Sequence, residues 1–92
     1  MNSVGAEIKV EGFVQGVGYR FFAHRLATGL GLTGWIRNNP NGSVLIRTEG
    51  DRGLIEELID NLKVGPRAAN VKDVKVRWMP FSGEFKSFEV VR

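Results

Sequence analysis

Residues 12–20, GFVQGVGYR, combine a glycine-rich turn with a single arginine at the point where a helical pattern begins. Gly16 and Gly18 allow a tight turn, because glycine adopts positive φ angles without a steric penalty. Successive backbone N–H groups in such a turn form a concave anion site, and the start of the following helix adds further donors. Arg20 supplies a planar set of donors that suits a phosphate or a carboxylate. The segment therefore predicts a pocket for a small oxyanion.

Length and composition limit the chemistry that can accompany this pocket. A chain of 92 residues predicts one domain, residues 1–92, because chains this short rarely build two hydrophobic cores. The absence of cysteine excludes disulfides and thiol catalysis, and the single histidine, His24, excludes a multi-histidine metal centre. We expect no cofactor and no metal. His24 lies opposite the apolar stripe of its predicted helix and is expected to be an exposed surface residue rather than a general base.

The charge balance and the amino terminus indicate location and partners. The net charge of +3 comes from scattered basic residues, which is typical of a solvated surface of mixed charge. No signal peptide and no apolar run of membrane-spanning length are evident. The expected location is the cytoplasm, with no membrane partner.

Hydrophobic periodicity predicts the elements that must position the oxyanion pocket. Alternation of apolar and polar residues indicates strands at 7–13, 32–38, 43–49, 71–79 and 86–91. Stripes of helical spacing indicate a helix over 20–30 and a second helix after the N-cap Asp51. The stripe of the first helix consists of Phe22, Leu26 and Leu30, with Ala23 and Ala27 beside them. The second helix should end at Gly65–Pro66, and Asn41–Gly42 indicates a hairpin between the second and third strands.

This order of elements predicts an α+β fold, a ferredoxin-like two-layer sandwich. We expect an antiparallel sheet of four to five strands with the two helices on one face. In that arrangement the turn after the first strand faces side chains of the hairpin.

Two stretches of the chain resemble a known family. GFVQGVGYR followed by LTGWIRNNPNGSVLIRTEGD resembles the two signature stretches of the acylphosphatases, and the similarity spans essentially the whole chain. Tyr19 stands where many members carry phenylalanine, and Asn41 stands where aspartate is usual. The resemblance implies hydrolysis of the carboxyl-phosphate anhydride of acyl phosphates, giving a carboxylate and inorganic phosphate.

The resemblance also implies which residues form the site. Arg20 would bind the phosphate, and Asn38 would position the attacking water. The backbone N–H groups of the turn would contact the phosphate oxygens, more than the Gln15 side chain does; these are the groups of Gln15, Gly16, Val17, Gly18, Tyr19 and Arg20. An acyl phosphate already has a good leaving group, so positioning and charge stabilisation would suffice, and a substrate oxygen would accept the proton of the water. The partners would be a small-molecule acyl phosphate and inorganic phosphate, the latter as product and competitive ligand, and a monomer is expected.

Three other interpretations compete with this one. Arg20 would have only a structural role if it paired with Glu7, Glu11 or solvent. The chain would be an RNA-binding module if aromatic residues lay on the open face of the central strands, but 43–49 has none and 7–13 has only Phe13, so no nucleic acid is expected. The third is a phosphate-sensing or carbamoyl-phosphate-handling domain, similar to the acylphosphatase-like domain of larger maturation proteins, or a regulatory module that binds without hydrolysis.

Overall fold

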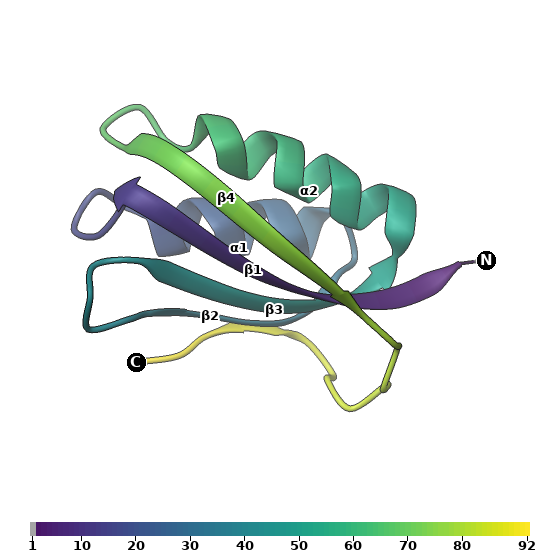
Figure 1. Cartoon of the computed structure of the whole chain (residues 1–92). Coiled ribbons are helices and arrows are strands. Elements are labelled where there is room, and N and C mark those ends of the chain that lie inside the picture. The colour runs from purple at the N-terminus through teal and green to yellow at the C-terminus, as the bar shows by residue number, and fades with distance from the viewer. Residues whose placement is uncertain (1) are drawn as a thin grey trace.

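A five-stranded sheet carries two helices on one of its faces in the computed structural model, which describes residues 2–92 (Figure 1). The elements follow the predicted order: β1 (Ser3–Phe13), α1 (Tyr19–Gly29), β2 (Thr33–Asn38), β3 (Val44–Asp51), α2 (Arg52–Val64), β4 (Asn70–Met79) and β5 (Phe88–Val90). The two-layer, ferredoxin-like sandwich is therefore confirmed. Within the described residues, neither helix is long and apolar enough to cross a membrane.

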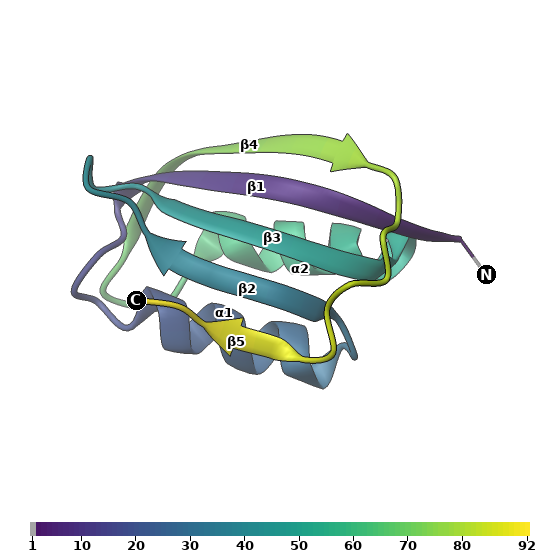
Figure 2. The ribbon, with the colours of Figure 1, turned by 90° about the horizontal axis from the view of Figure 1, so that it is seen from below.

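The strands lie in the order β4-β1-β3-β2-β5 (Figure 2). All neighbouring strands are antiparallel except β2 and β5, which pair in parallel from Gly34↔Phe88 to Ile36↔Val90. The sheet is thus mixed, whereas the sequence predicted an antiparallel one. The reason is topological. Strand β4 ends at the end of the sheet where β2 begins. The chain crosses that end to the opposite edge of the sheet before it enters β5, so β5 runs in the direction of β2.

The core lies between the sheet and the helices. Strand residues that point to the helices, such as Ile8, Val10 and Ile46, have no exposed surface, and α2 contributes Leu58 and Leu62 at the expected spacing. As predicted, Asp51 caps α2 by accepting a hydrogen bond from the Leu54 N–H at 3.2 Å, and Gly65 ends the helix with φ 73°. These features fix α2 against β1, β3 and β4.

Helix α1 turns the alanine side of its predicted apolar stripe to the core. Tyr19, Ala23 and Ala27 are its buried residues, whereas Phe22, Leu26 and Leu30 are only partly buried. Two predictions about single side chains are wrong. The alternation of 86–91 predicts Phe88 and Val90 inward, but Val90, the last residue of the edge strand β5, is 42% exposed. His24 is half-buried rather than exposed, with its ring 6.1 Å from the ring of Phe88.

Candidate active site

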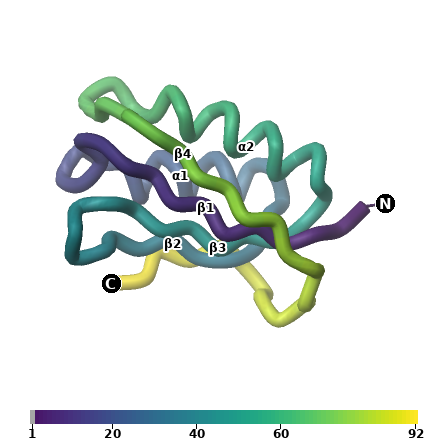
Figure 3. The backbone as a smooth tube through the Cα atoms, in the orientation of Figure 1, coloured from purple at the N-terminus to yellow at the C-terminus, as the bar shows by residue number. Residues whose placement is uncertain are grey.

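The glycine-rich turn and the hairpin meet at one end of the sheet. Strands β1 and β2 flank β3 and are both antiparallel to it. They therefore run in the same direction and finish at the same end of the sheet. The loop after β1, residues 14–18, and the loop after β2, residues 39–43, therefore lie at the same end of the molecule, as does the carboxyl terminus (Figure 3). The topology brings together two segments that are more than twenty residues apart.

The loop of residues 14–18 has the backbone of an anion cradle. Gly16 and Gly18 adopt φ 75° and 78°, and open space surrounds the position of a Cβ at each, so the requirement for glycine is conformational rather than steric. No side chain caps the start of α1, and the Phe22 N–H makes the first helical bond, to Gly18 C=O at 3.0 Å. Within residues 2–92, the N–H groups of residues 15–18 have no protein acceptor. These donors are available to a ligand.

Arg20 follows this cradle in the first turn of α1 and is half-buried. It forms no ion pair with any residue that the structure describes. The carboxylate of Glu7 is bound to Arg77 at 3.0 Å, and that of Glu11 lies 3.5–3.6 Å from the amines of Lys75 and Lys9. The prediction of an ion pair between Arg20 and Glu7 or Glu11 is therefore wrong, and the guanidinium has no ion-pair partner among the described residues.

Asn38 is the last residue of β2 and has the same parity as the buried Ile36, so its side chain points to the face that carries the helices. Its Oδ1 atom is buried and has no hydrogen-bond partner among the described residues. Buried polar atoms are almost always hydrogen-bonded, so this oxygen is an acceptor that a ligand or a water can use. Asn38 and Arg20 both line a cavity of about 320 Å³, together with Val14, Gly16, Gly18, Tyr19, Phe21, Val90 and Arg92.

The side chain of Gln15 joins the loop of residues 14–18 to the hairpin, which the sequence did not predict. Its amide nitrogen donates to the carbonyl oxygens of Asn39, at 2.7 Å, and Ser43, at 2.8 Å. These two acceptors lie on either side of the hairpin loop, so one side chain fixes the separation between the cradle and Asn38. A glutamine in a glycine-rich loop carries no sequence signal for this contact, because its partners are backbone atoms of a distant segment.

A hydrogen-bond network inside the hairpin holds the end of β2. The Asn41 Oδ1 atom accepts from the Ser43 N–H at 3.1 Å and from the Ser43 hydroxyl at 2.6 Å. The side-chain amide of Asn39 donates to the hydroxyl oxygen of Ser43 at 3.0 Å. Position 41 thus needs a side-chain acceptor, which aspartate and asparagine both provide. The departure from the family pattern at this position leaves the turn intact.

Tyr19 contributes its side chain to the core rather than to the cavity chemistry. It is 1% exposed, and its hydroxyl donates to the Leu62 carbonyl oxygen at 2.7 Å. Burial raises the pKa of this hydroxyl well above its usual value, so it remains a donor. The hydroxyl that distinguishes tyrosine from phenylalanine here ties the start of α1 to α2. Val17, the remaining apolar residue of residues 15–18, is half-buried.

Comparisons with known proteins agree on one family. The sequence model of the family described as Acylphosphatase matches residues 6–90. A protein of Methanococcoides burtonii named acylphosphatase is 45% identical over 87 residues, which cover 95% of this chain and 91% of that protein. The crystal structure of acylphosphatase from Bacillus subtilis superposes with a TM-score of 0.94 at 30% identity and covers 97% of this chain and 99% of its own. A full-length HypF structure in a phosphate- and nucleotide-bound form matches at TM-score 0.90 and 32% identity, over 99% of this chain but 12% of HypF.

Proposed function

Because the chain belongs to the acylphosphatase family, whose activity is acylphosphate hydrolysis, we propose that the cavity shared by Arg20 and Asn38 is its active site. The phosphate of the substrate sits in the loop formed by residues 14–18. The backbone N–H groups of Gln15, Gly16, Val17, Gly18, Tyr19 and Arg20 bind its oxygens, and the Arg20 guanidinium neutralises its charge. The buried, unpartnered Asn38 Oδ1 is the observation that carries this proposal, since it provides an acceptor for a water beside the bound phosphate.

The reaction needs few groups from the protein. Asn38 accepts a hydrogen bond from the water and aligns its oxygen with phosphorus, on the side opposite the leaving carboxylate. As the water oxygen bonds to phosphorus, the phosphorus–oxygen bond to the acyl group breaks and its electron pair leaves with the carboxylate. The water proton passes to a phosphate oxygen of the substrate. The positive charge of Arg20 and the loop dipoles stabilise the phosphoryl oxygens throughout.

Gln15 has a positioning role in this proposal. Its two hydrogen bonds, at 2.7 and 2.8 Å, couple the phosphate loop to the hairpin that carries Asn38. In-line attack tolerates little misplacement, and a shift of about 1 Å costs about 10²-fold in rate. The loop backbone therefore binds the phosphate, while the Gln15 side chain fixes the distance between the phosphate and the water that Asn38 holds.

The site is suited to catalysis without a metal. The side chains that line the cavity include two arginines and no carboxylate within the described chain, which favours an anion over a cation. We expect the rate of hydrolysis to be unchanged by a chelator such as EDTA. A loss of activity that added Mg²⁺ restores would refute the metal-free mechanism.

Membership of the acylphosphatase family suggests the partners and the location of the protein. We propose a small-molecule acyl phosphate as substrate, inorganic phosphate as product and competitive ligand, a monomeric enzyme, and action in the cytoplasm. The open face of the central strand β1 carries alternating charges that pair with neighbours, as in Arg77–Glu7 and Lys75–Glu11, so little net charge is offered to a nucleic acid.

Hydrolysis of benzoyl phosphate, compared with the monoester phenyl phosphate, tests the proposal. The cavity has no general acid, so only the good leaving group of the anhydride should depart, and benzoyl phosphate should react at least about 10³-fold faster than the monoester. Similar rates for the two compounds would contradict an anhydride-specific site. Phosphate binding without hydrolysis of either would favour the purely regulatory alternative.

A further inference from the structure

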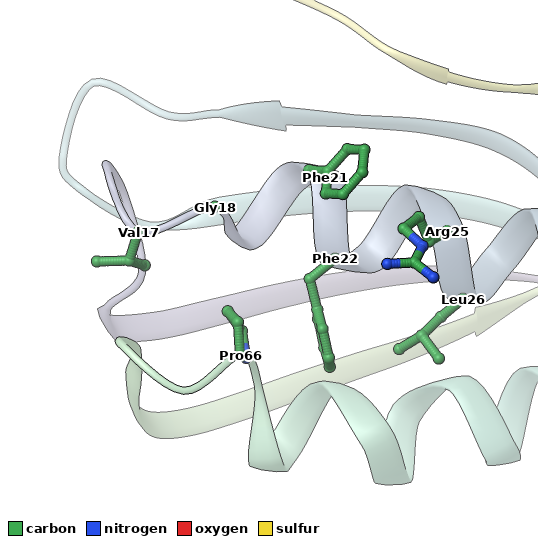
Figure 4. A pocket seen from close by; sticks show the side chains of 7 residues that line it. All are labelled: Val17, Gly18, Phe21, Phe22, Arg25, Leu26 and Pro66. Atoms are coloured by element: carbon green, nitrogen blue, oxygen red, sulfur yellow. The ribbon is translucent and has the colours of Figure 1, made fainter.

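A second and larger cavity, of about 530 Å³, adjoins the phosphate site on the side of α1 that faces α2. Figure 4 shows its walls: side chains of the loop and of α1 on one side and Pro66, from the turn after α2, on the other. Apolar side chains dominate these walls, with one charged residue at the rim; the lining includes Val17, Phe21, Phe22, Arg25, Leu26 and Pro66. The mechanism proposed above does not use this cavity.

The two cavities adjoin at the start of α1. Gly18 and Phe21 line both of them, whereas Asn38 lines only the smaller one. In an in-line displacement the leaving group lies opposite the attacking water. With the water beside Asn38, the acyl group leaves past Gly18 and Phe21, away from the hairpin. The larger cavity is the space in that direction.

We propose that this cavity, hereafter the acyl groove, binds the organic part of the substrate and selects acyl phosphates with an apolar acyl group, aromatic or branched aliphatic. The inference rests on the proposed active site, because it uses the phosphate position set by the loop and Arg20. It goes beyond that site by assigning a substrate class and the residues that select it.

The chemistry of the walls matches such a group. Phe21 is 64% exposed, and the Phe22 and Leu26 side chains beside it are only partly buried. Covering them with an aromatic ring removes apolar surface from water on both partners. The Arg25 guanidinium lies 5.7 Å from the centre of the Phe21 ring, which holds the ring at the mouth of the acyl groove. A small acyl group such as acetyl is too short to gain from these contacts.

The kinetics of benzoyl phosphate and acetyl phosphate test the acyl groove, because both are anhydrides of similar leaving-group strength. We expect the parent protein to give a kcat/KM at least about tenfold higher for benzoyl phosphate, since apolar contacts of this size discriminate by one to two orders of magnitude. Phe21→Ala and, independently, Phe22→Leu should lower the ratio of the two kcat/KM values, by about tenfold and about threefold. The inhibition constant of inorganic phosphate should change far less than this ratio, because phosphate has no acyl part.

Phe81→Ala is the matched control, since Phe81 is a 51% exposed phenylalanine that lines neither cavity. It should leave the ratio unchanged. A parent ratio near one, or a ratio that neither groove variant alters, would overturn the acyl groove while leaving the active site standing. Failure of the parent protein to hydrolyse both compounds would instead refute the proposed function.

Discussion

Both ends of the sheet present backbone N–H groups that can bind an anion, but only one end supplies the anion from the chain itself. At one end the carboxylate of Glu49, on β3, accepts hydrogen bonds from the Ser82 N–H at 2.8 Å, the Ser82 hydroxyl at 2.7 Å and the Gly83 N–H at 3.0 Å. At the other end the loop of residues 14–18 offers its N–H groups, but no carboxylate among the described residues accepts from them. We refer to these as the closed end and the open end.

The closed end is a structural lock. Glu49 is 1% exposed and holds the segment that carries the chain from β4 across the sheet to β5. Burial raises the pKa of its carboxyl, but the hydrogen bonds from Ser82 and Gly83 and the charge of Arg47 outweigh this effect, and the pKa lies below its usual value. A cluster of donors filled by a carboxylate of the chain itself stabilises the fold and leaves nothing for a ligand.

The open end has donors and a cation without an internal anion. Arg20 lies at the positive end of a helix dipole, where a cation is unfavourable unless an anion joins it. Because no described residue pairs with this charge, its pairing energy remains available to an anion, and the Asn38 oxygen remains available as an acceptor for a water. The difference between the ends indicates that an unfilled cluster of donors, rather than a cluster of donors as such, marks the proposed site.

Removing the cation of the open end should have the largest effect. Arg20→Ala is expected to lower kcat/KM for benzoyl phosphate by at least about 10³-fold, because a charged donor to the phosphoryl oxygens is lost. The inhibition constant of inorganic phosphate should rise in parallel. Arg77→Ala, which removes an arginine already paired with Glu7, is the matched control and should retain full activity. Normal hydrolysis by the Arg20 variant would remove the distinction between the two ends.

Removing the orphaned acceptor comes next. Asn38→Ala should lower kcat by about 10²-fold or more while the inhibition constant of phosphate stays nearly the same, because the water and not the phosphate loses its partner. Asn61→Ala, on the far face of α2, removes an exposed asparagine and should leave kcat unchanged. A variant at position 38 that weakens phosphate binding and kcat equally would assign Asn38 to binding instead.

The closed end should respond in stability and not in catalysis. Glu49→Gln keeps the size of the side chain but weakens its hydrogen bonds, and we expect the free energy of unfolding to fall by about 2 kcal/mol. Urea unfolding measures this loss, and kcat/KM for benzoyl phosphate should remain within a factor of about two. A large drop in activity at full stability would show that the two ends are coupled.

The connection between the phosphate loop and the hairpin should have a smaller effect on activity. Gln15→Ala retains the backbone N–H group and removes the two side-chain hydrogen bonds to Asn39 and Ser43, so we expect kcat/KM to fall by about tenfold. Steady-state kinetics with the phosphate inhibition constant as reference would detect it. Unchanged kinetics would mean that the hairpin network alone places Asn38.

Acidification should produce the smallest effect. The pKa of Glu49 is lower in the folded protein than its ordinary value of 4.5, so its contribution to stability is complete above pH 4.5 and is lost as the pH falls through the folded value. The melting temperature of the parent protein should therefore decline more steeply below pH 4.5 than that of Glu49→Gln, which carries no titrating group there. Parallel curves would contradict the ionised carboxylate at the closed end.

Much of the fold could be predicted because it depends on local patterns. Alternation along 7–13 and the stripe ending at Leu62 gave β1 and α2 their inward faces, and Asp51 and Gly65 marked the helix ends through backbone chemistry that neighbours do not alter. The side of the α1 stripe that lies deepest and the direction of β5 could not be predicted. The first depends on how the helix packs on the sheet, and the second on the end of the sheet at which β4 stops.

Residue types and their spacing specify the parts of the proposed site: two glycines that permit positive φ, an arginine at a helix start, an asparagine before a hairpin, and two stretches that resemble the acylphosphatases. Folding establishes which of these parts lie together and which remain unpaired. Only the shared direction of β1 and β2 brings Asn38 to the cavity of Arg20, and only the packing shows that Glu7, Glu11 and Glu49 are already occupied elsewhere. The reason is physical. A residue type fixes which groups are offered, but whether a charge or a lone pair is left for a ligand depends on every partner that folding brings within reach.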